Sequence, residues 1–272
     1  MSILVPRSHY VIDDITRSVI SNRCSTVTKA VNKEFWNGST DMSHSFYVGS
    51  YGRHTAINTS DIDILMKLPK SEYERYDSLK GNGQSRLLQG VKKAIQETYG
   101  RSEVHADGQI IIINFSDEMI FEILPAFEEI NFIGEVIFTY PDSNKGGKWK
   151  STDPKAEINA MAEKNKLSQG LFYDTCQHMR YIRDNYYSSY SLSGIVIDTF
   201  IYHEMGNWHW TSSGEGSSKP GDYESVLLNA YNKATGLGIY NPRYIVPGSE
   251  MQISLSDEDT KVLGKVLRKM AE

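Results

Sequence analysis

The chain has 272 residues, of which 39% are hydrophobic and 23% are charged, a globular composition that excludes general disorder. Its 34 acidic residues outnumber its 29 basic ones, which argues against a protein that coats duplex nucleic acid, because such a protein needs a basic surface. Two cysteines are too few for a disulfide scaffold, and neither an apolar run of membrane-spanning length nor a signal peptide is recognisable, so we expect a soluble, cytoplasmic protein.

The first half of the chain predicts a mixture of helices and strands. Apolar residues recur at helical spacing over residues 12–36 and 85–99, which predicts two amphipathic helices. Short apolar runs predict strands at residues 46–48, 62–68, 109–115, 119–124 and 133–138. The brief interruption at residues 116–118 is typical of the turn of an antiparallel hairpin.

The pattern changes near residue 140. A stretch rich in Gly, Lys and Asn over residues 140–153 is interpreted as a loop. Beyond it, the spacing predicts helices at 154–165, 168–186, 193–205, 222–235 and 257–271. We therefore expect an α+β fold in which a lobe with a mixed sheet (1–150) packs on a helical lobe (151–272), with the ligand site in the cleft between them.

One segment carries the strongest chemical signal. Residues 49–57 read GSYGRHTAI, and residues 60–64 read SDIDI. Asp61 and Asp63 are two positions apart on a predicted strand, so both side chains leave the same face, with Cα atoms about 6.6 Å apart. Two carboxylates at this separation can bridge a pair of cations, and their oxygen ligands favour Mg²⁺ or Mn²⁺.

The turn before this strand complements the two acids. Gly49 and Ser50 would expose backbone N–H groups and a hydroxyl, which suit phosphate oxygens. A lone Asp-x-Asp is usually a solvent-facing pair, and a lone Gly-Ser is usually only a turn. Together, at this spacing, they predict phosphoryl or nucleotidyl transfer with two divalent cations.

The same segment resembles the signature of the polymerase β-like nucleotidyltransferase superfamily. The similarity is greatest to its bacterial cyclic GMP-AMP synthase-like and dinucleotide cyclase branch, also called CD-NTases of the SMODS type. Three further stretches support that branch: the hairpin of residues 110–127, the segment 141–154, and the pair of sequences MRY at 179–181 and SSY at 188–190. The resemblance covers roughly residues 10–210.

The resemblance implies a third metal-binding acid at Glu122, where relatives often carry Asp. Glu122 could instead be an edge-strand residue that faces water, and Asp117 and Glu118 in the turn are weaker candidates for the third acid. His54 stands where many relatives carry a small residue, which implies a differently shaped loop.

The resemblance also implies residues that hold a nucleotide. Gly49, Ser50 and Thr55 belong to the motif itself. By position, Arg180 would contact the triphosphate, Ser189 would add a hydroxyl contact, and Tyr190 would stack on the donor base. The alternatives are that Arg180 or Arg183 only faces solvent, that Ser191 replaces Ser189, and that Tyr186 or Tyr187 replaces Tyr190.

These residues imply a metal-dependent enzyme that joins nucleoside triphosphates and releases pyrophosphate. The resemblance further implies a cyclic di- or trinucleotide second messenger in anti-phage signalling, a downstream effector that responds to it, and a possible regulatory protein partner, with no stable duplex nucleic acid and no membrane as partner. Two alternatives stay open: transfer to another acceptor, such as a tRNA end, a small molecule or a protein, and a catalytically silent nucleotide-binding module.

Overall fold

The computed structural model describes residues 3–38, 40, 41, 43–57, 61–100, 102–132, 134–211, 221–236, 242–249 and 251–272. The chain divides into two compact units. The sheet unit comprises Asp13–Gly52 and Asp61–Pro154, and the helical unit comprises Met1–Ile12, Arg53–Ser60 and Lys155–Glu272.

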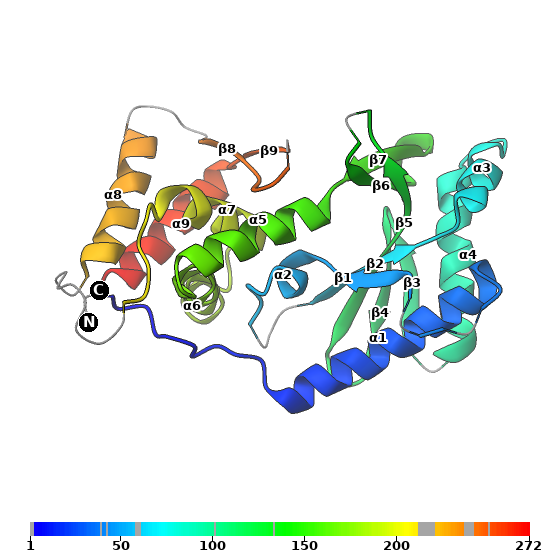
Figure 1. Ribbon diagram of the computed structural model, residues 1–272, viewed down its shortest axis with the longest axis horizontal. Coiled ribbons are helices and arrows are strands. Elements are labelled where there is room, and N and C mark those ends of the chain that lie inside the picture. The colour runs from blue at the N-terminus through cyan, green and yellow to red at the C-terminus, as the bar shows by residue number, and fades with distance from the viewer. Residues whose placement is uncertain are drawn as a thin grey trace. The chain divides into compact units, whose positions relative to one another are not determined.

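The elements of the sheet unit follow one another as shown in Figure 1. They are α1 (Asp14–Phe35), β1 (Ser45–Tyr47), α2 (Gly49–Gly52), β2 (Ile62–Lys67), α3 (Lys70–Asp77), α4 (Gly83–Thr98), β3 (Glu103–Asp107), β4 (Ile110–Asn114), β5 (Ile120–Ile130), β6 (Val136–Asp142), the 3-10 turn η1 (Asn144–Gly146) and β7 (Lys148–Thr152).

The sheet is mixed, and its centre is the long strand β5. The strand order is β1-β2-β5-β4-β3, and β6 joins the far part of β5 to β7. Strands β2 and β5 run parallel, whereas β1 and β4 are antiparallel to their neighbours β2 and β5. The predicted hairpin is present, with the N–H of Phe115 donating to the carbonyl of Met119 across the turn.

One face of the sheet packs in the core with α1 and α4. Ile62, Ile64 and Met66 of β2 lie in this core together with Phe121 and Ile123 of β5. Because side chains alternate along a strand, Asp63 and Glu122 are left on the opposite face. The apolar alternation of the strands therefore decides which face of the sheet carries the acids.

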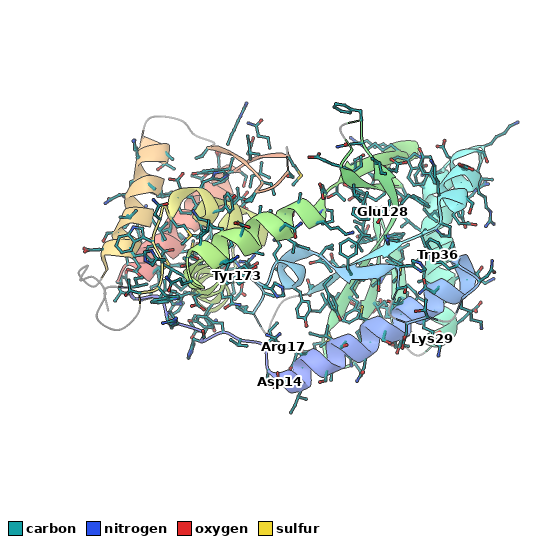
Figure 2. The ribbon with its side chains drawn as sticks, viewed as in Figure 1. Asp14, Arg17, Lys29, Trp36, Glu128 and Tyr173 are labelled. Atoms are coloured by element: carbon teal, nitrogen blue, oxygen red, sulfur yellow. The ribbon has the colours of Figure 1, made fainter. Side chains whose placement is uncertain are left out.

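Residues at both ends of helix α1 fix where the helix begins and ends. Asp13 accepts a hydrogen bond from the N–H of Thr16 at the start of the helix. At the other end, Asn37 takes a left-handed conformation with φ 51°, a common way for a helix to end. Trp36, labelled in Figure 2, donates its indole N–H to the carbonyl of Lys67 at 3.0 Å and so ties this end to β2.

The interpretation of residues 140–153 as a loop was wrong. Strand β6 runs to Asp142, and β7 pairs with it antiparallel from Lys148 to Thr152. Gly146 and Gly147 both have positive φ and belong to the turn between the strands, which is why this stretch looks loop-like in composition. Asp142 forms an ion pair with Lys150 at 2.9 Å, which stabilises the pairing of β6 with β7.

The helical unit is built from α5 (Pro154–Leu167), α6 (Leu171–Tyr186), α7 (Gly194–Glu204), α8 (Asp222–Gly236) and α9 (Asp257–Met270), with a small hairpin of β8 (Arg243–Ile245) and β9 (Gln252–Ser254). One apolar core joins α6, α7, α8 and α9. No helix in the described part of the chain is long and apolar enough to cross a bilayer.

Two segments expected in the first lobe belong to the helical unit instead. Residues 1–12 and 53–60 group with residues 155–272. The first segment is held by Glu224, whose carboxylate accepts from the N–H groups of Leu4 and Val5 at 2.7 and 3.1 Å. These ties are between residues far apart in sequence, so a boundary drawn at a single position could not include them.

Candidate active site

Two of the predicted acids lie side by side on the sheet. Asp63 on β2 and Glu122 on β5 are register partners of the parallel pair. Register partners point to the same face, with backbones about 4.8 Å apart. Both carboxylates therefore lie on the face opposite the α1–α4 core and form the centre of the candidate site.

The electrostatics of Glu122 show that the acids converge. Burial, the charges of Asp63 and Asp61, a hydrogen bond with Asp63 and the charge of Asp107 raise the pKa of Glu122 from 4.5 to about 7. Desolvation also raises the pKa of Asp61, which directly precedes β2. Like charges that perturb one another in this way are typical of sites that bind cations or exchange protons.

Asp107, at the end of β3, was not singled out from the sequence. It lies on the edge strand and pairs in register with Ile110 of β4. Its charge contributes to the raised pKa of Glu122. The sequence signal was weak, because Asp107-Gly108 reads as a simple turn.

The donor set fits a hard divalent cation. Among the residues that the structure describes, no three His, Cys, Asp or Glu side chains already stand together as a metal site. However, Asp61, Asp63 and Glu122 offer only carboxylate oxygens, which Mg²⁺ and Mn²⁺ prefer. The negative charges of these acids repel one another, and this repulsion contributes to the raised pKa of Glu122. A bound cation would instead attract all three carboxylates. Asp61, Asp63 and Glu122 are thus the residues that would hold it.

A pocket of about 200 Å³ adjoins Asp63 and Glu122. Its lining comes from the sheet unit: Val48, Asp63, Gln109, Ile110, Glu122, Leu124, Tyr140 and Thr152. The volume is below the roughly 300–1,000 Å³ of sites that enclose a whole drug-sized ligand. The pocket therefore suits one part of a larger ligand, with the acids at its wall.

Gly49 must be glycine because of its approach to Asp63. It has φ +58°, and a Cβ atom built on it would lie 1.8 Å from Oδ2 of Asp63. The N–H of Val48 also donates to the carbonyl of Asp63 at 2.9 Å. The sequence predicted a turn here, and the structure adds the reason for its tightness: the turn passes directly over a predicted metal ligand. Ser50 follows in the one-turn helix α2, next to this contact.

The predicted triphosphate contact of Arg180 stays a prediction, and the structure places this side chain in the interior of the helical unit. Its side chain is 1% exposed and forms an ion pair with Asp198, with Nη1 at 2.6 Å from Oδ1 and Nη2 at 2.9 Å from Oδ2. Nη2 also donates to the carbonyl of Gly194. A guanidinium that is buried and already bonded to a carboxylate has no surface to offer to phosphate.

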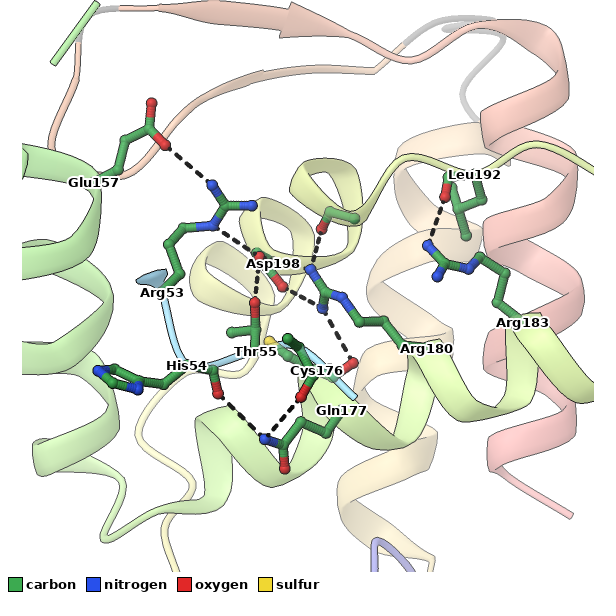
Figure 3. A network of polar contacts seen from close by, with 12 residues as sticks. Arg53, His54, Thr55, Glu157, Cys176, Gln177, Arg180, Arg183, Leu192 and Asp198 are labelled. Carbon is green, nitrogen blue, oxygen red and sulfur yellow. Dashed lines mark hydrogen bonds and ion pairs between the residues drawn. The ribbon is translucent and has the colours of Figure 1, made fainter. Parts of the chain in front are cut away.

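Thr55 is directed inward as well. It is fully buried, and its hydroxyl donates to Oδ2 of Asp198 at 2.9 Å. A direct nucleotide contact by this side chain is therefore not what the structure shows. Figure 3 shows Thr55 and Arg180 converging on Asp198, a residue that sequence reasoning missed. Its signal was available, since Asp198 is the one acid within the apolar sequence GIVIDTF of α7.

Ser189 and Tyr190 lie in the exposed segment after α6 in the helical unit. Tyr190 is 39% exposed, and the ammonium of Lys265 lies 3.8 Å from the centroid of its ring. A hydrogen bond from Lys265 and its charge lower the pKa of Tyr190. An exposed ring beside a cation is suited to stacking, so the predicted roles of Ser189 and Tyr190 stay predictions.

Comparisons with known proteins place this geometry in a family context. A sequence model of the second messenger oligonucleotide or dinucleotide synthetase domain matches residues 8–165. A protein of Bacillus cereus (strain VD146) named as a probable cyclic nucleotide synthase is 26% identical over 184 residues, which are 65% of this chain and 50% of that protein. The chain thus spans about half the length of this curated relative.

Solved structures show the same fold. The CdnE cyclic dinucleotide synthase of Elizabethkingia meningoseptica, solved with GTP and Apcpp, has a TM-score of 0.63 at 15% identity, covering 95% of this chain and 97% of that one. The CdnE c-UMP-AMP synthase of Rhodothermus marinus, solved with Apcpp and Upnpp, has a TM-score of 0.64 at 14% identity, covering 97% and 92%. The CdnC:HORMA-deltaN complex of E. coli MS115-1 has a TM-score of 0.62 at 9% identity, covering 96% and 85%. The expected α+β fold is confirmed.

Proposed function

This chain belongs to the second messenger oligonucleotide or dinucleotide synthetase family, and we propose that it joins nucleoside triphosphates into a cyclic di- or trinucleotide and releases pyrophosphate. The observation that carries the proposal is the register pair Asp63–Glu122, with Asp61 close enough for its charge to raise the pKa of Glu122. Three acids kept at one end of a parallel strand pair are costly without a cation, which supports an active rather than a silent site.

Two divalent cations held by Asp61, Asp63 and Glu122, Mg²⁺ or Mn²⁺, would supply charge neutralisation and activation of the attacking hydroxyl. The chain itself supplies the rest. Because Gly49 has no side chain, it leaves space for the carboxylate of Asp63. The turn at Gly49 and Ser50 offers backbone N–H groups and a hydroxyl to phosphate oxygens. Glu122, one of the three carboxylates, is proposed to help take the proton of the attacking ribose hydroxyl.

The substrates follow from the relatives as a proposal. The CdnE proteins with this fold were solved with GTP and Apcpp or with Apcpp and Upnpp. We therefore propose nucleoside triphosphates as substrates, with the pocket beside Glu122 receiving one part of a nucleotide. Ser189 and Tyr190 are proposed to contact the donor nucleotide from the helical unit.

A regulatory partner and an anti-phage role are part of the same proposal. CdnC of E. coli MS115-1 was solved in a complex with HORMA-deltaN, which supports a protein partner that controls this chain. The product would act on a downstream effector, as expected for a second messenger. A cytoplasmic location agrees with both.

The proposal is tested by incubating the protein with all four nucleoside triphosphates and Mg²⁺ or Mn²⁺. Pyrophosphate release and a product that resists phosphatase are expected. A linear product, or label transferred to the protein or to tRNA, would contradict cyclisation and would indicate a nucleotidyltransferase with another acceptor.

A further inference from the structure

The loop between the two halves of the motif is anchored in the helical unit. Residues 53–60 belong to this unit, whereas the flanking Gly49–Gly52 and the strand that begins after Asp61 belong to the sheet unit. Figure 3 shows the side chains that hold the loop. At their centre is Asp198 of α7, which is 0% exposed.

Consecutive residues of the loop are each tied to α6 or α7. Oδ2 of Asp198 accepts from Nε of Arg53 at 3.1 Å and from the hydroxyl of Thr55 at 2.9 Å. Nε2 of Gln177 donates to the carbonyl oxygens of His54 at 3.2 Å and Ala56 at 3.4 Å. The backbone and side chains from Arg53 to Ala56 are thus fixed together, which a loop with only a linking role does not require.

The network is balanced in charge. Arg180 forms a two-pronged ion pair with Asp198, and Arg53 also reaches Glu157 at 3.4 Å. Two guanidinium groups are therefore matched by two carboxylates in a buried region, where an unmatched charge would be strongly unfavourable. Burial acts to raise the pKa of Asp198, but the charges of Arg180 and Arg53 hold this pKa below its usual value. Asp198 therefore stays ionised at neutral pH.

Resting on the proposed function, we propose that Asp198 is a positioning residue for nucleotidyl transfer: through Arg53 and Thr55 it fixes residues 53–56, which directly follow the turn that carries Gly49 and Ser50. Asp198 and Thr55 are both 0% exposed, so neither side chain presents a surface to a substrate. Gly52, the last residue of α2, directly precedes Arg53, so the fixed segment begins where the turn of Gly49 and Ser50 ends. Gly49 in turn lies close to Asp63, which links the anchored segment to a predicted metal ligand.

The decisive variant is Thr55→Val rather than Asp198→Asn. The second leaves Arg53 and Arg180 with only Glu157 as counter-charge and endangers folding. Thr55→Val keeps the volume and the charge balance and removes one hydrogen bond to Asp198. Thr175→Val is the matched control, because Thr175 is equally buried and its hydroxyl bonds to the carbonyl of Leu171 and the hydroxyl of Tyr223, away from the loop.

Four quantities are measured on the full chain: kcat, KM for nucleoside triphosphates, the Mn²⁺ dissociation constant by electron paramagnetic resonance without nucleotide, and hydrogen exchange in the 53–57 segment. For Thr55→Val we expect about tenfold lower kcat, about the effect of losing one hydrogen bond to a charged group. Weaker Mn²⁺ binding and faster exchange should accompany it, with KM unchanged. Thr55→Ser should restore all of these, and Thr175→Val should leave them unchanged at a similar loss of Tm.

Equal effects of Thr55→Val and Thr175→Val would reduce the network to a structural role and overturn the proposal. A rise in KM alone would instead mean that Thr55 contacts the nucleotide, and this also overturns it. If the parent protein makes no nucleotide product, the proposed function fails, while Mn²⁺ binding and hydrogen exchange still decide whether Asp198 positions the loop.

Discussion

Glu122 on β5 lies directly beside Asp63 on β2, at register-paired positions of two parallel strands. Burial, followed by the charges of Asp63 and Asp61, raises the pKa of Glu122 to about 7. The pair has two consequences that can be measured without substrate: a dependence of stability on pH and a competition between protons and cations.

The contribution of Glu122 to the stability of the metal-free protein should fall as pH rises. Between the ordinary pKa of 4.5 and the raised pKa of about 7, the folded state binds more protons at Glu122 than the unfolded state does. The contribution of Glu122 to the free energy of unfolding therefore falls with rising pH in this window and levels off above it. His178, whose pKa burial lowers to about 4, contributes in the opposite direction, so the parent is compared with a variant at each pH. Tm measured from pH 4 to 8 with a chelator tests this. The stability of the parent relative to Glu122→Gln should fall from pH 4 to 8, whereas Glu97→Gln, at an exposed site on α4, should follow the profile of the parent.

Divalent cations should stabilise the protein more at pH 8 than at pH 6. Above the pKa of Glu122 no proton has to be displaced before a cation binds. At a concentration of about 100 Kd, binding to the folded state alone contributes about 2.7 kcal/mol. Thermal unfolding with and without Mn²⁺ measures this, and Asp63→Asn should remove most of the gain. A gain that is the same in Asp63→Asn would place the cation elsewhere.

Gly49→Ala should lower the rate of nucleotide transfer at least about tenfold. An added Cβ would overlap Oδ2 of Asp63 at 1.8 Å, so either the turn or the carboxylate must move. Gly206→Ala is the matched control, because Gly206 has the same φ of +58° with nothing within 4 Å of an added Cβ. Both variants share the left-handed strain, roughly 1 kcal/mol, so a lower rate confined to Gly49→Ala reports the contact with Asp63. Equal rates in the two variants would exclude it.

Arg180→Gln should destabilise the protein by about 3–5 kcal/mol, because it leaves a buried carboxylate without its main partner. Chemical denaturation measures the loss, and Arg268→Gln, at an exposed site on α9, should change stability by less than about 0.5 kcal/mol. A stable Arg180→Gln variant with a raised KM for triphosphates would favour the phosphate contact that the sequence suggested.

The acids of the site could be predicted because their signal is local. Asp61 and Asp63 alternate with the apolar residues of β2, and this pattern decides both the strand and the face. The register that brings Glu122 beside Asp63 joins residues far apart in sequence, so it was available only through the resemblance to known enzymes.

The anchoring network could not be predicted in the same way. Phe172, Cys176 and Arg180 are four residues apart on α6 and all buried, so the helical spacing does place Arg180 on the buried face. Its partner Asp198 lies on another helix, and only the fold shows that they meet. Thr55 looked like part of the nucleotide site because it lies within the motif, whereas its side chain, like that of Arg53, bonds to Asp198.

Mass spectrometry of the products formed from the four nucleoside triphosphates, by the parent chain and by Asp63→Asn in parallel, tests the central claim most directly. We expect the parent to yield a phosphatase-resistant cyclic oligonucleotide with pyrophosphate, and Asp63→Asn to yield neither while unfolding at a similar or higher temperature without metal. A cyclic product that persists undiminished in Asp63→Asn, or a folded parent that consumes no triphosphate with either Mg²⁺ or Mn²⁺, would contradict the account.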